Sequence, residues 1–512
     1  MSGSFAELLP ELPELLGGHL RLTLLALAVG LSLSLPLGVL ATRLPRLERV
    51  VMGLASVIQT IPGLALLAVM VPLLALVSLP SIGMLPALIG LSAYSVLPIL
   101  RNTVTGIRGV DPAYIEAARG VGMSERERLR LVELPLALPV IVAGVRTASV
   151  WVVGTATLST PVGAPSLGNY IFSGLQTRND AAVVLGCVGA ALLALSLDGL
   201  IRAFEWALVE RRVGLRRGLL GLFALAYVWV FALPLLDARR GPAPEASVVI
   251  GTKPFTEQYI LGELLVAQLD SHTELEPSVL PSLGSKVAFD ALVAGEVDVY
   301  VEYTGTLWTN VMGRETADSR EQVLRELEDW LAREHDVELV AALGFENAYA
   351  LAVPAARAEQ LGLERIDQLT PHAPGWSIAG DYEFFSRPEW QALRDRYGLR
   401  FDQTRAMDSA LMYEALQSGE AEVLSAYSSD GRVAAYELRI LADPRAAIPP
   451  YDAVVLVNGE AARTKVGLRE ALAALEGRVS VERMRSANMA VDLEGQTPAQ
   501  VGAQLHRELE KN

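Results

Sequence analysis

The chain has 512 residues, of which 51% are hydrophobic and 20% are charged, and its mean hydropathy is positive. It is richer in apolar residues than an ordinary soluble protein, so a membrane-embedded part is predicted. The net charge of −15 leaves no basic footprint for nucleic acid, and the sequence has no zinc-finger pattern or Cys/His spacing typical of a metal site. Neither nucleic-acid binding nor a metal is expected.

Long uncharged stretches lie almost entirely before Asp237. A helix needs about 20 mostly apolar residues to cross a bilayer. Residues 50–100 carry no charge and are long enough for two crossings, with a break near Leu79-Pro80-Ser81. An all-α polytopic membrane domain with about six transmembrane helices is therefore predicted for residues 1–236. The crossings are residues 22–42, two within 50–100, and residues 138–158, 181–204 and 218–236.

Arginine is concentrated in alternate loops between these crossings, and such loops favour the cytoplasmic side. The N-terminus and everything after the sixth crossing are therefore predicted to be extracytoplasmic, at the cytoplasmic (inner) membrane, although Arg239 and Arg240 oppose this trend. Acidic residues precede the first crossing where a signal peptide would be basic, so this crossing is expected to remain in the mature protein. The arginines in question are Arg43, Arg46, Arg49, Arg101, Arg108, Arg119, Arg126, Arg128, Arg130, Arg202, Arg211, Arg212, Arg216 and Arg217.

The loop between the third and fourth crossings contains EAA at residues 116–118, then Gly122, then LP at residues 134–135. A short helix with small residues on one face, followed by a glycine that allows a sharp turn, forms a compact knob suited to a cleft on another protein. The pattern resembles the EAA loop of ABC importer permeases at every named position. The resemblance implies that the ATPase-coupling residues are Glu116, Ala117, Ala118, Gly122, Leu134 and Pro135.

The sequence contains no phosphate-binding loop of the type G-x-x-x-x-G-K-[ST]. The chain is therefore not expected to be an enzyme, and ATP hydrolysis is assigned to a separate ABC ATPase subunit. Arg146 lies inside the fourth crossing, where an ionisable side chain is a functional candidate. It is expected either to line the pathway or brace the bundle, or to lie near the cytoplasmic end and extend to the interface.

Strand and helix patterns alternate over residues 246–512, after a linker at residues 237–245. Thr256 is a suitable N-cap for the first helix, and residues 320–333 form another. These patterns predict a two-lobed α/β domain resembling periplasmic binding proteins, which closes around its ligand about two hinges. The predicted strands are residues 247–251, 298–302, 337–340, 349–353, 376–379, 422–426 and 453–457.

Three motifs in this half are GTKPFTEQ at residues 251–258, EYTGT at 302–306 and YSSDGR at 427–432. They resemble the glycine betaine, choline and carnitine binding proteins of osmoprotectant importers, over residues 247–511, and the membrane half resembles the partner permeases. A quaternary ammonium cannot donate a hydrogen bond, so electron-rich aromatic faces hold it best. The resemblance implies a cage formed by Tyr303, Tyr349, Tyr427 and Tyr451.

A betaine also carries a carboxylate, which needs a cation and hydroxyl donors. The resemblance implies an anion clamp made by Lys253, Thr306 and Arg387, which would disfavour choline because choline lacks a carboxylate. Lys286 departs from the family pattern and is expected either to alter the pocket rim or to be exposed.

Asp381, Tyr382 and Glu383 lie close to Arg387 in the sequence and could add a carboxylate to the site. An added carboxylate would suit a larger cationic solute such as carnitine or ergothioneine.

Together the two halves predict the membrane subunit of an ABC importer fused to its own solute-binding domain, without a cofactor. The expected solute is a quaternary ammonium compound such as glycine betaine or proline betaine. Carnitine, choline and ergothioneine remain alternatives, as does a ligand-binding membrane sensor without transport. The resemblance also implies a homodimer of this chain in the lipid bilayer, with two ATPase subunits.

Overall fold

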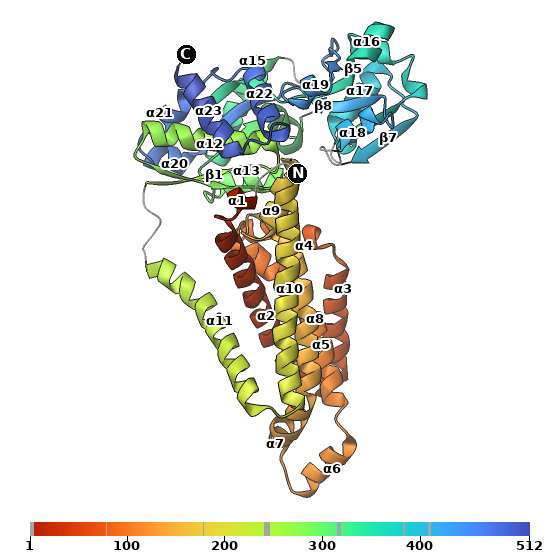
Figure 1. Ribbon diagram of the computed structural model, residues 1–512, viewed down its shortest axis with the longest axis vertical. Helices are drawn as coiled ribbons and strands as arrows, with labels where there is room; N and C mark the ends of the chain where they lie inside the picture. The colour runs from red at the N-terminus through yellow and green to blue at the C-terminus, as the bar shows by residue number, and fades with distance from the viewer. Residues whose placement is uncertain are drawn as a thin grey trace. The chain divides into compact units, whose positions relative to one another are not determined.

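The computed structural model describes residues 5–77, 79–177, 179–239, 246–314, 319–381, 384–407 and 411–511. These form two compact units, one made mainly of the helices before residue 240 and one mainly of the residues after 246 (Figure 1). The predicted linker at 237–245 is helical as far as Arg239, and its remaining residues lie outside the described ones.

All the secondary structure described in the first unit is helical. Five helices are long and apolar enough to span a membrane, or six where the bent pair α3 and α4 is taken as one span, so the predicted polytopic helical domain is confirmed. The elements are α1 (Phe5–Leu8), α2 (Leu12–Arg43), α3 (Pro45–Thr60), α4 (Gly63–Ala75), α5 (Met84–Arg108), α6 (Pro112–Gly120), α7 (Glu125–Arg128), the π-helical η1 (Leu129–Glu133), α8 (Leu134–Ala156), the 3-10 η2 (Thr157–Val162), α9 (Gly168–Gln176), α10 (Asp180–Val209) and α11 (Val213–Arg239).

The second crossing is broken in a way that the hydropathy pattern did not indicate. Helices α3 and α4 meet at 104°, and the bend falls at Ile61 and Pro62. Proline disfavours helical backbone at the preceding residue, and Ile61 is extended, with φ −72° and ψ 128°. The predicted break near Leu79-Pro80-Ser81 is confirmed, because it falls between α4 and α5.

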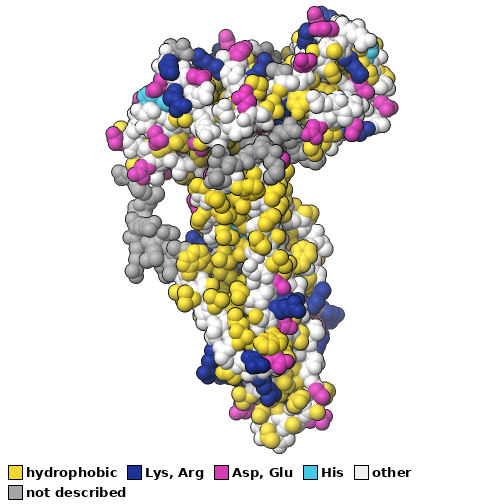
Figure 2. Space-filling view, in the orientation of Figure 1, with side chains coloured by type: hydrophobic (Ala, Val, Ile, Leu, Met, Phe, Trp, Pro, Cys, Tyr) yellow, Lys and Arg dark blue, Asp and Glu magenta, His cyan; other side chains and the backbone are white. Residues whose placement is uncertain are grey.

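Helix α5 is the centre of the bundle and packs against both α2 and α8. The helices approach one another at glycines: a Cβ on Gly30 would collide with Ser95, and one on Gly144 with Asn102. Small residues are typical where transmembrane helices pack closely. Figure 2 shows hydrophobic side chains over much of the visible bundle and Lys and Arg toward the end that carries α6 and α7.

Arg146 of α8 forms ion pairs with two carboxylates of α10. Its Nε lies 2.7 Å from Asp198 Oδ1, and its Nη1 lies 3.3 Å from Glu205 Oε2. Of the two alternatives for this side chain, the geometry favours bracing of the bundle, because the guanidinium joins α8 to α10 through two ion pairs.

The second unit contains two five-stranded sheets, which confirms the predicted two-lobed α/β architecture. The first sheet has the order β2-β1-β3-β10-β4, and the second has the order β7-β6-β8-β5-β9. The strands of the first are β1 (Ser247–Gly251), β2 (Glu276–Leu280), β3 (Val299–Tyr303), β4 (Val337–Glu346) and β10 (Asp452–Asn458). Those of the second are β5 (Tyr349–Pro354), β6 (Ser377–Asp381), β7 (Gln403–Met407), β8 (Val423–Tyr427) and β9 (Leu438–Ile440).

Helices cover these sheets, with one large apolar core that extends into both lobes and a second, smaller one in the second lobe. The predicted helix at residues 320–333 is α15, which continues to His335. The helices are α12 (Thr256–His272), α13 (Ser285–Val293), α14 (Thr304–Thr306), η3 (Leu307–Val311), α15 (Arg320–His335), α16 (Ala355–Leu361), η4 (Ile366–Leu369), η5 (Ala373–Gly375), η6 (Phe384–Ser386), α17 (Pro388–Tyr397), α18 (Met412–Gln417), α19 (Arg432–Ala435), α20 (Gly459–Thr464), α21 (Leu468–Ala473), α22 (Val481–Asp492) and α23 (Pro498–Glu510).

The chain passes between the two lobes twice, between β4 and β5 and again just before β10. The two crossing segments are hydrogen-bonded to each other, since the backbone N–H of Asn347 donates to the backbone carbonyl of Tyr451 at 3.0 Å. Tyr349 and Tyr451 therefore lie at the two places where a hinge motion would bend the chain.

Candidate ligand pocket

A cavity of about 350 Å³ in the second unit is lined by residues of both lobes, a volume in the range of ligand sites. Its walls come from the ends of β3 and β8, the start of β5, and the loop after β1. All the residues predicted for the cage and the clamp line this cavity, although their roles in binding stay predictions. They are Lys253, Tyr303, Thr306, Tyr349, Arg387, Tyr427 and Tyr451.

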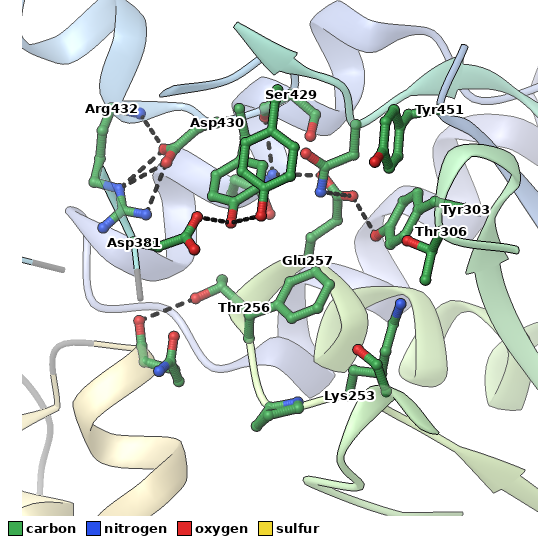
Figure 3. A pocket seen from close by; sticks show the side chains of 18 of the residues that line it. Lys253, Thr256, Glu257, Tyr303, Thr306, Asp381, Ser429, Asp430, Arg432 and Tyr451 are labelled. Carbon is green, nitrogen blue, oxygen red and sulfur yellow. Dashed lines mark hydrogen bonds and ion pairs between the residues drawn. The ribbon is translucent and has the colours of Figure 1, made fainter. Parts of the chain in front are cut away.

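Three of the four tyrosines meet in one cluster. The ring centroid of Tyr349 lies 4.9 Å from that of Tyr427 and 6.1 Å from that of Tyr451, with the second pair perpendicular. Tyr303 lies apart from this cluster and stacks at 6.2 Å on Phe255. In Figure 3, Tyr303 and Tyr451 are on one side of the pocket and Asp381, Asp430 and Arg432 on the other.

Three tyrosine hydroxyls in the pocket each donate a hydrogen bond to a carboxylate. Tyr303 donates to Glu257 at 2.6 Å and Tyr427 to Asp381 at 2.6 Å. Tyr451 donates to Glu389 of α17, which is almost fully buried. These bonds fix the ring orientations and place a carboxyl group at the hydroxyl edge of each ring.

Burial controls the protonation of these groups. Desolvation, reinforced by the neighbouring carboxylates, raises the pKa of Tyr303, Tyr427 and Tyr451 well above the ordinary value, so all three hydroxyls remain donors near neutral pH. Desolvation also raises the pKa of Glu257, although hydrogen bonds from neutral groups partly offset the effect. Besides Tyr303, the amides of Asn347 and Asn488 donate to Glu257 at 3.0 Å each.

The predicted clamp residues are held in different ways. Lys253 is 2% exposed and pairs with Glu302, and its Nζ lies 4.7 Å from the centroid of the Tyr303 ring. The guanidinium of Arg387 lies over the face of Tyr349 at 5.3 Å. Lys253 is therefore neither a solvated surface charge nor a free ammonium, and Arg387 is the cation placed against the tyrosine cluster.

Several lining residues had no role assigned from the sequence. Glu257 lies in the GTKPFTEQ motif and Asp430 in the YSSDGR motif, whereas Asn488 and Asp492 lie on α22, where no sequence motif marks them.

Thr256 is also a lining residue, and its predicted role as an N-cap is wrong. Phe255 is the capping residue, and the Thr256 hydroxyl donates instead to Asp492 at 2.6 Å.

The structure also bears on the expectations for Lys286 and Asp381. The side chain of Lys286 is 75% exposed and pairs with Asp290 one helical turn away, as the second alternative for this residue expected. Asp381 lines the pocket, as the sequence suggested, while Tyr382 and Glu383 lie outside the described residues.

The predicted coupling loop forms a projecting knob at one end of the helix bundle (Figure 1). Residues 116–118 lie on α6, which Asp111 caps, and Gly122 has a φ of +83°, a conformation that suits glycine. Leu134 and Pro135 begin α8. Tyr114 and Val121 are 56% and 74% exposed, so the knob carries exposed apolar side chains. Its coupling role stays a prediction.

Two protein families match the two parts of the chain. Residues 34–209 match the family described as the binding-protein-dependent transport system inner membrane component. Residues 246–506, half of the chain, match the substrate binding domain of ABC-type glycine betaine transport systems.

Similar proteins combine or separate these parts. The ergothioneine transport permease/ergothioneine binding protein EgtU of Helicobacter pylori (strain G27) is 27% identical over 90% of this chain and 84% of its own length. The glycine betaine/carnitine/choline transport system permease protein OpuCB of Bacillus subtilis (strain 168) is 42% identical over 38% of this chain and 86% of its own.

A crystal structure titled as a glycine betaine/carnitine/choline ABC transporter is 26% identical, with a TM-score of 0.48 over 51% of this chain and 98% of that one. The relatives are transport permeases and binding proteins, not enzymes, and the family implies a separate ATPase. The chain therefore belongs to the family of substrate binding domains of ABC-type glycine betaine transport systems, joined on one polypeptide to the inner membrane component of an importer for osmoprotectant-type solutes.

Proposed function

We propose that this importer takes up a quaternary ammonium solute and that the tyrosine-lined pocket is where the solute binds. One observation carries the proposal: the hydroxyls of Tyr303, Tyr427 and Tyr451 each donate a hydrogen bond to a buried carboxylate. Each phenol is polarised by an anionic acceptor, so its ring face becomes more electron-rich and attracts a cation more strongly. The cation itself needs no hydrogen-bond acceptor, which suits a trimethylammonium group.

The proposed solute is zwitterionic, with glycine betaine or proline betaine as the first candidates. Arg387 supplies the cation for the solute carboxylate, and Thr306 supplies a hydroxyl donor. Lys253 is already paired with Glu302, so it forms part of the pocket wall and is not the cation that binds the carboxylate. Carnitine and ergothioneine carry the same two charged groups, and the EgtU relative supports ergothioneine as an alternative. Choline, which lacks the carboxylate, should bind more weakly.

The proposed transport cycle uses both units. The binding domain lies on the extracytoplasmic side, as the arginine distribution predicts, and α11 with the segment to residue 245 tethers it to the bundle. Because both units are on one chain, the binding domain has an effective concentration of about millimolar at the bundle wherever the linker can span the docking distance. The knob of α6 and Gly122 docks a separate ATPase, and two copies of this chain form the membrane pathway.

Calorimetry on the purified full chain tests the solute. Glycine betaine, proline betaine, carnitine and ergothioneine should release or absorb heat with one saturable site per chain, and choline should bind more weakly. If no quaternary ammonium compound binds, the proposed solute class is wrong. Transport is tested by uptake in cells that co-express the ATPase: a sensor would bind solute but accumulate none.

A further inference from the structure

Two histidines and a glutamate from opposite ends of the sequence of the binding domain converge on its surface. His272 is the last residue of α12, and His506 and Glu510 occupy one face of α23 at i and i+4. The two imidazole rings lie edge to face, with their centroids 6.0 Å apart. The site lies on two helices that pack together along their length.

The three donor atoms have the spacing of a metal-ligand set. One oxygen of Glu510 lies 3.7 Å from the Nε2 atoms of both His272 and His506, and all three donor atoms lie within 4.8 Å of one another. Tetrahedral Zn²⁺ with bonds of about 2.0–2.1 Å places neighbouring donors about 3.3–3.4 Å apart. A contraction of about 0.3–0.4 Å in the two 3.7 Å distances would bring Glu510 to the spacing from each imidazole that Zn²⁺ requires.

The surrounding hydrogen bonds prepare one histidine for metal. The Nδ1 of His272 lies 3.0 Å from the Gln268 carbonyl, so Nδ1 carries the proton and the lone pair of Nε2 points toward Glu510. A backbone carbonyl on the far ring nitrogen is the usual way in which proteins orient a metal-binding histidine. Ser271 Oγ lies 3.0 Å from His506 Nε2, and its hydroxyl can turn the proton away when a metal binds.

The Glu510 carboxylate lies close to both imidazoles without hydrogen-bonding to either. The distance of 3.7 Å from its oxygen to each Nε2 is too long for a hydrogen bond. A metal ion between the three donor atoms would supply the missing interaction, since Zn²⁺ binds imidazole nitrogens and carboxylate oxygens together.

We propose that His272, His506 and Glu510 bind a divalent transition metal, with Zn²⁺ as the best match to two imidazoles and one carboxylate. Water or a solvent-borne ligand completes the tetrahedron, because the side chains of His272 and Glu510 are 42% and 49% exposed. The metal would join the end of α12 to the last turn of α23 and so hold the C-terminal helix on the domain.

The metal site is separate from the solute pocket. Thr256 and Glu257 line the pocket at the start of α12, and His272 ends the same helix 16 residues later. At 1.5 Å per residue the two sites lie about 24 Å apart. Metal binding should therefore leave solute affinity unchanged, and its failure would not affect the proposed function.

The test is a Zn²⁺ titration of the full chain, prepared without a histidine tag and stripped with a chelator. Calorimetry should show one saturable site per chain, and Zn²⁺ should raise the unfolding temperature. His272→Ala and Glu510→Gln should each weaken Zn²⁺ binding by at least about tenfold. Both side chains are about half exposed, so neither change should prevent folding. His372→Ala, a histidine elsewhere on the domain, is the matched control and should bind Zn²⁺ normally.

Two results would overturn the proposal. One is the absence of both heat and a thermal shift with Zn²⁺ in the unmodified chain. The other is Zn²⁺ binding that survives in both His272→Ala and Glu510→Gln, because it would place the metal elsewhere.

Discussion

Carboxylate groups have different partners in the membrane bundle and in the solute pocket. In the bundle, Arg146 forms ion pairs with Asp198 and Glu205, and at the start of α8 Glu133 accepts from both Arg43 and Arg128. In the pocket, the hydrogen bonds to Glu257 come from neutral phenol and amide groups, and Tyr451 donates to Glu389 in the same way.

The difference follows from what each region has to do. A charge inside a bilayer is expensive, so pairing with the opposite charge stabilises the helices that carry it. Neutral donors orient a carboxylate without cancelling its charge, so a pocket built from them keeps an attraction for a cationic solute. The pocket also contains full ion pairs, such as Lys253 with Glu302 and Arg432 with Asp430, which hold its walls. Four substitutions probe this contrast.

Arg146→Met should have the largest effect. It leaves Asp198 and Glu205 without their cation inside the membrane, at a cost of about 2.5 to 3.5 kcal/mol for an uncompensated charge near a helix centre. The yield of folded protein and solute uptake should both collapse. Combining it with Asp198→Asn and Glu205→Gln should restore the yield, measured by size-exclusion chromatography. A normal yield of the single variant would show that the triad does not brace the bundle.

Tyr427→Ala should weaken binding of a quaternary ammonium solute by up to about 30-fold, because one aromatic face contributes as much as about 2 kcal/mol to a desolvated cation. Tyr427→Phe keeps the ring and removes the hydrogen bond to Asp381, so it should lose only a few-fold. Calorimetry on the full chain measures both. Equal losses in the two variants would mean that the hydroxyl, not the ring, holds the solute.

Arg387→Ala should weaken binding of betaines by about tenfold, since a hydrogen bond to a charged group contributes about 1.5 kcal/mol or more. Binding of choline, which has no carboxylate, should hardly change. Lys286→Ala is the control, because its side chain is exposed and pairs with Asp290. A similar loss for choline and glycine betaine would show that Arg387 shapes the pocket and does not clamp an anion.

Glu257→Gln should have the smallest effect at neutral pH and the clearest effect on the pH profile. Burial raises the pKa of Glu257, so lowering the pH protonates this carboxylate earlier than an ordinary glutamate. A cation binds the ionised form better, so affinity should fall as the pH falls through this pKa. Calorimetry across the pH range should give a flatter profile for the variant; an unchanged profile would assign the titration to another group.

The missed strands show why part of the fold could not be derived from the sequence. The strands β2, β7 and β9, which were not predicted, all lie at the edges of their sheets. Edge strands are partly exposed and carry polar residues, so they lack the apolar run that marks a buried strand. The central strands β3 and β10 are buried throughout and were recognised. The kink at Pro62 was missed because hydropathy does not register backbone geometry.

The site was predictable where its residues lie in recognisable motifs. Motifs containing Tyr303 and Tyr427 indicated an aromatic site, and the structure places these side chains on one cavity. The sequence did not indicate that Lys253 is paired with Glu302, or that Asn488 of the distant α22 donates to Glu257. Such contacts join residues more than 40 positions apart, so local patterns contain no trace of them.

By itself, the sequence determined that helices fill the first half, that two α/β lobes fill the second, and which tyrosines to examine. The helices and the lobes follow from periodicity and composition, which act along the chain, whereas the tyrosines follow from the family resemblance of the motifs that contain them. Tertiary structure alone decided which polar side chains are paired: Arg146 with Asp198 and Glu205, Lys253 with Glu302, and Tyr303 with Glu257. Pairing depends on distances of a few ångströms between segments that folding brings together, and those distances decide how strongly a cation is attracted.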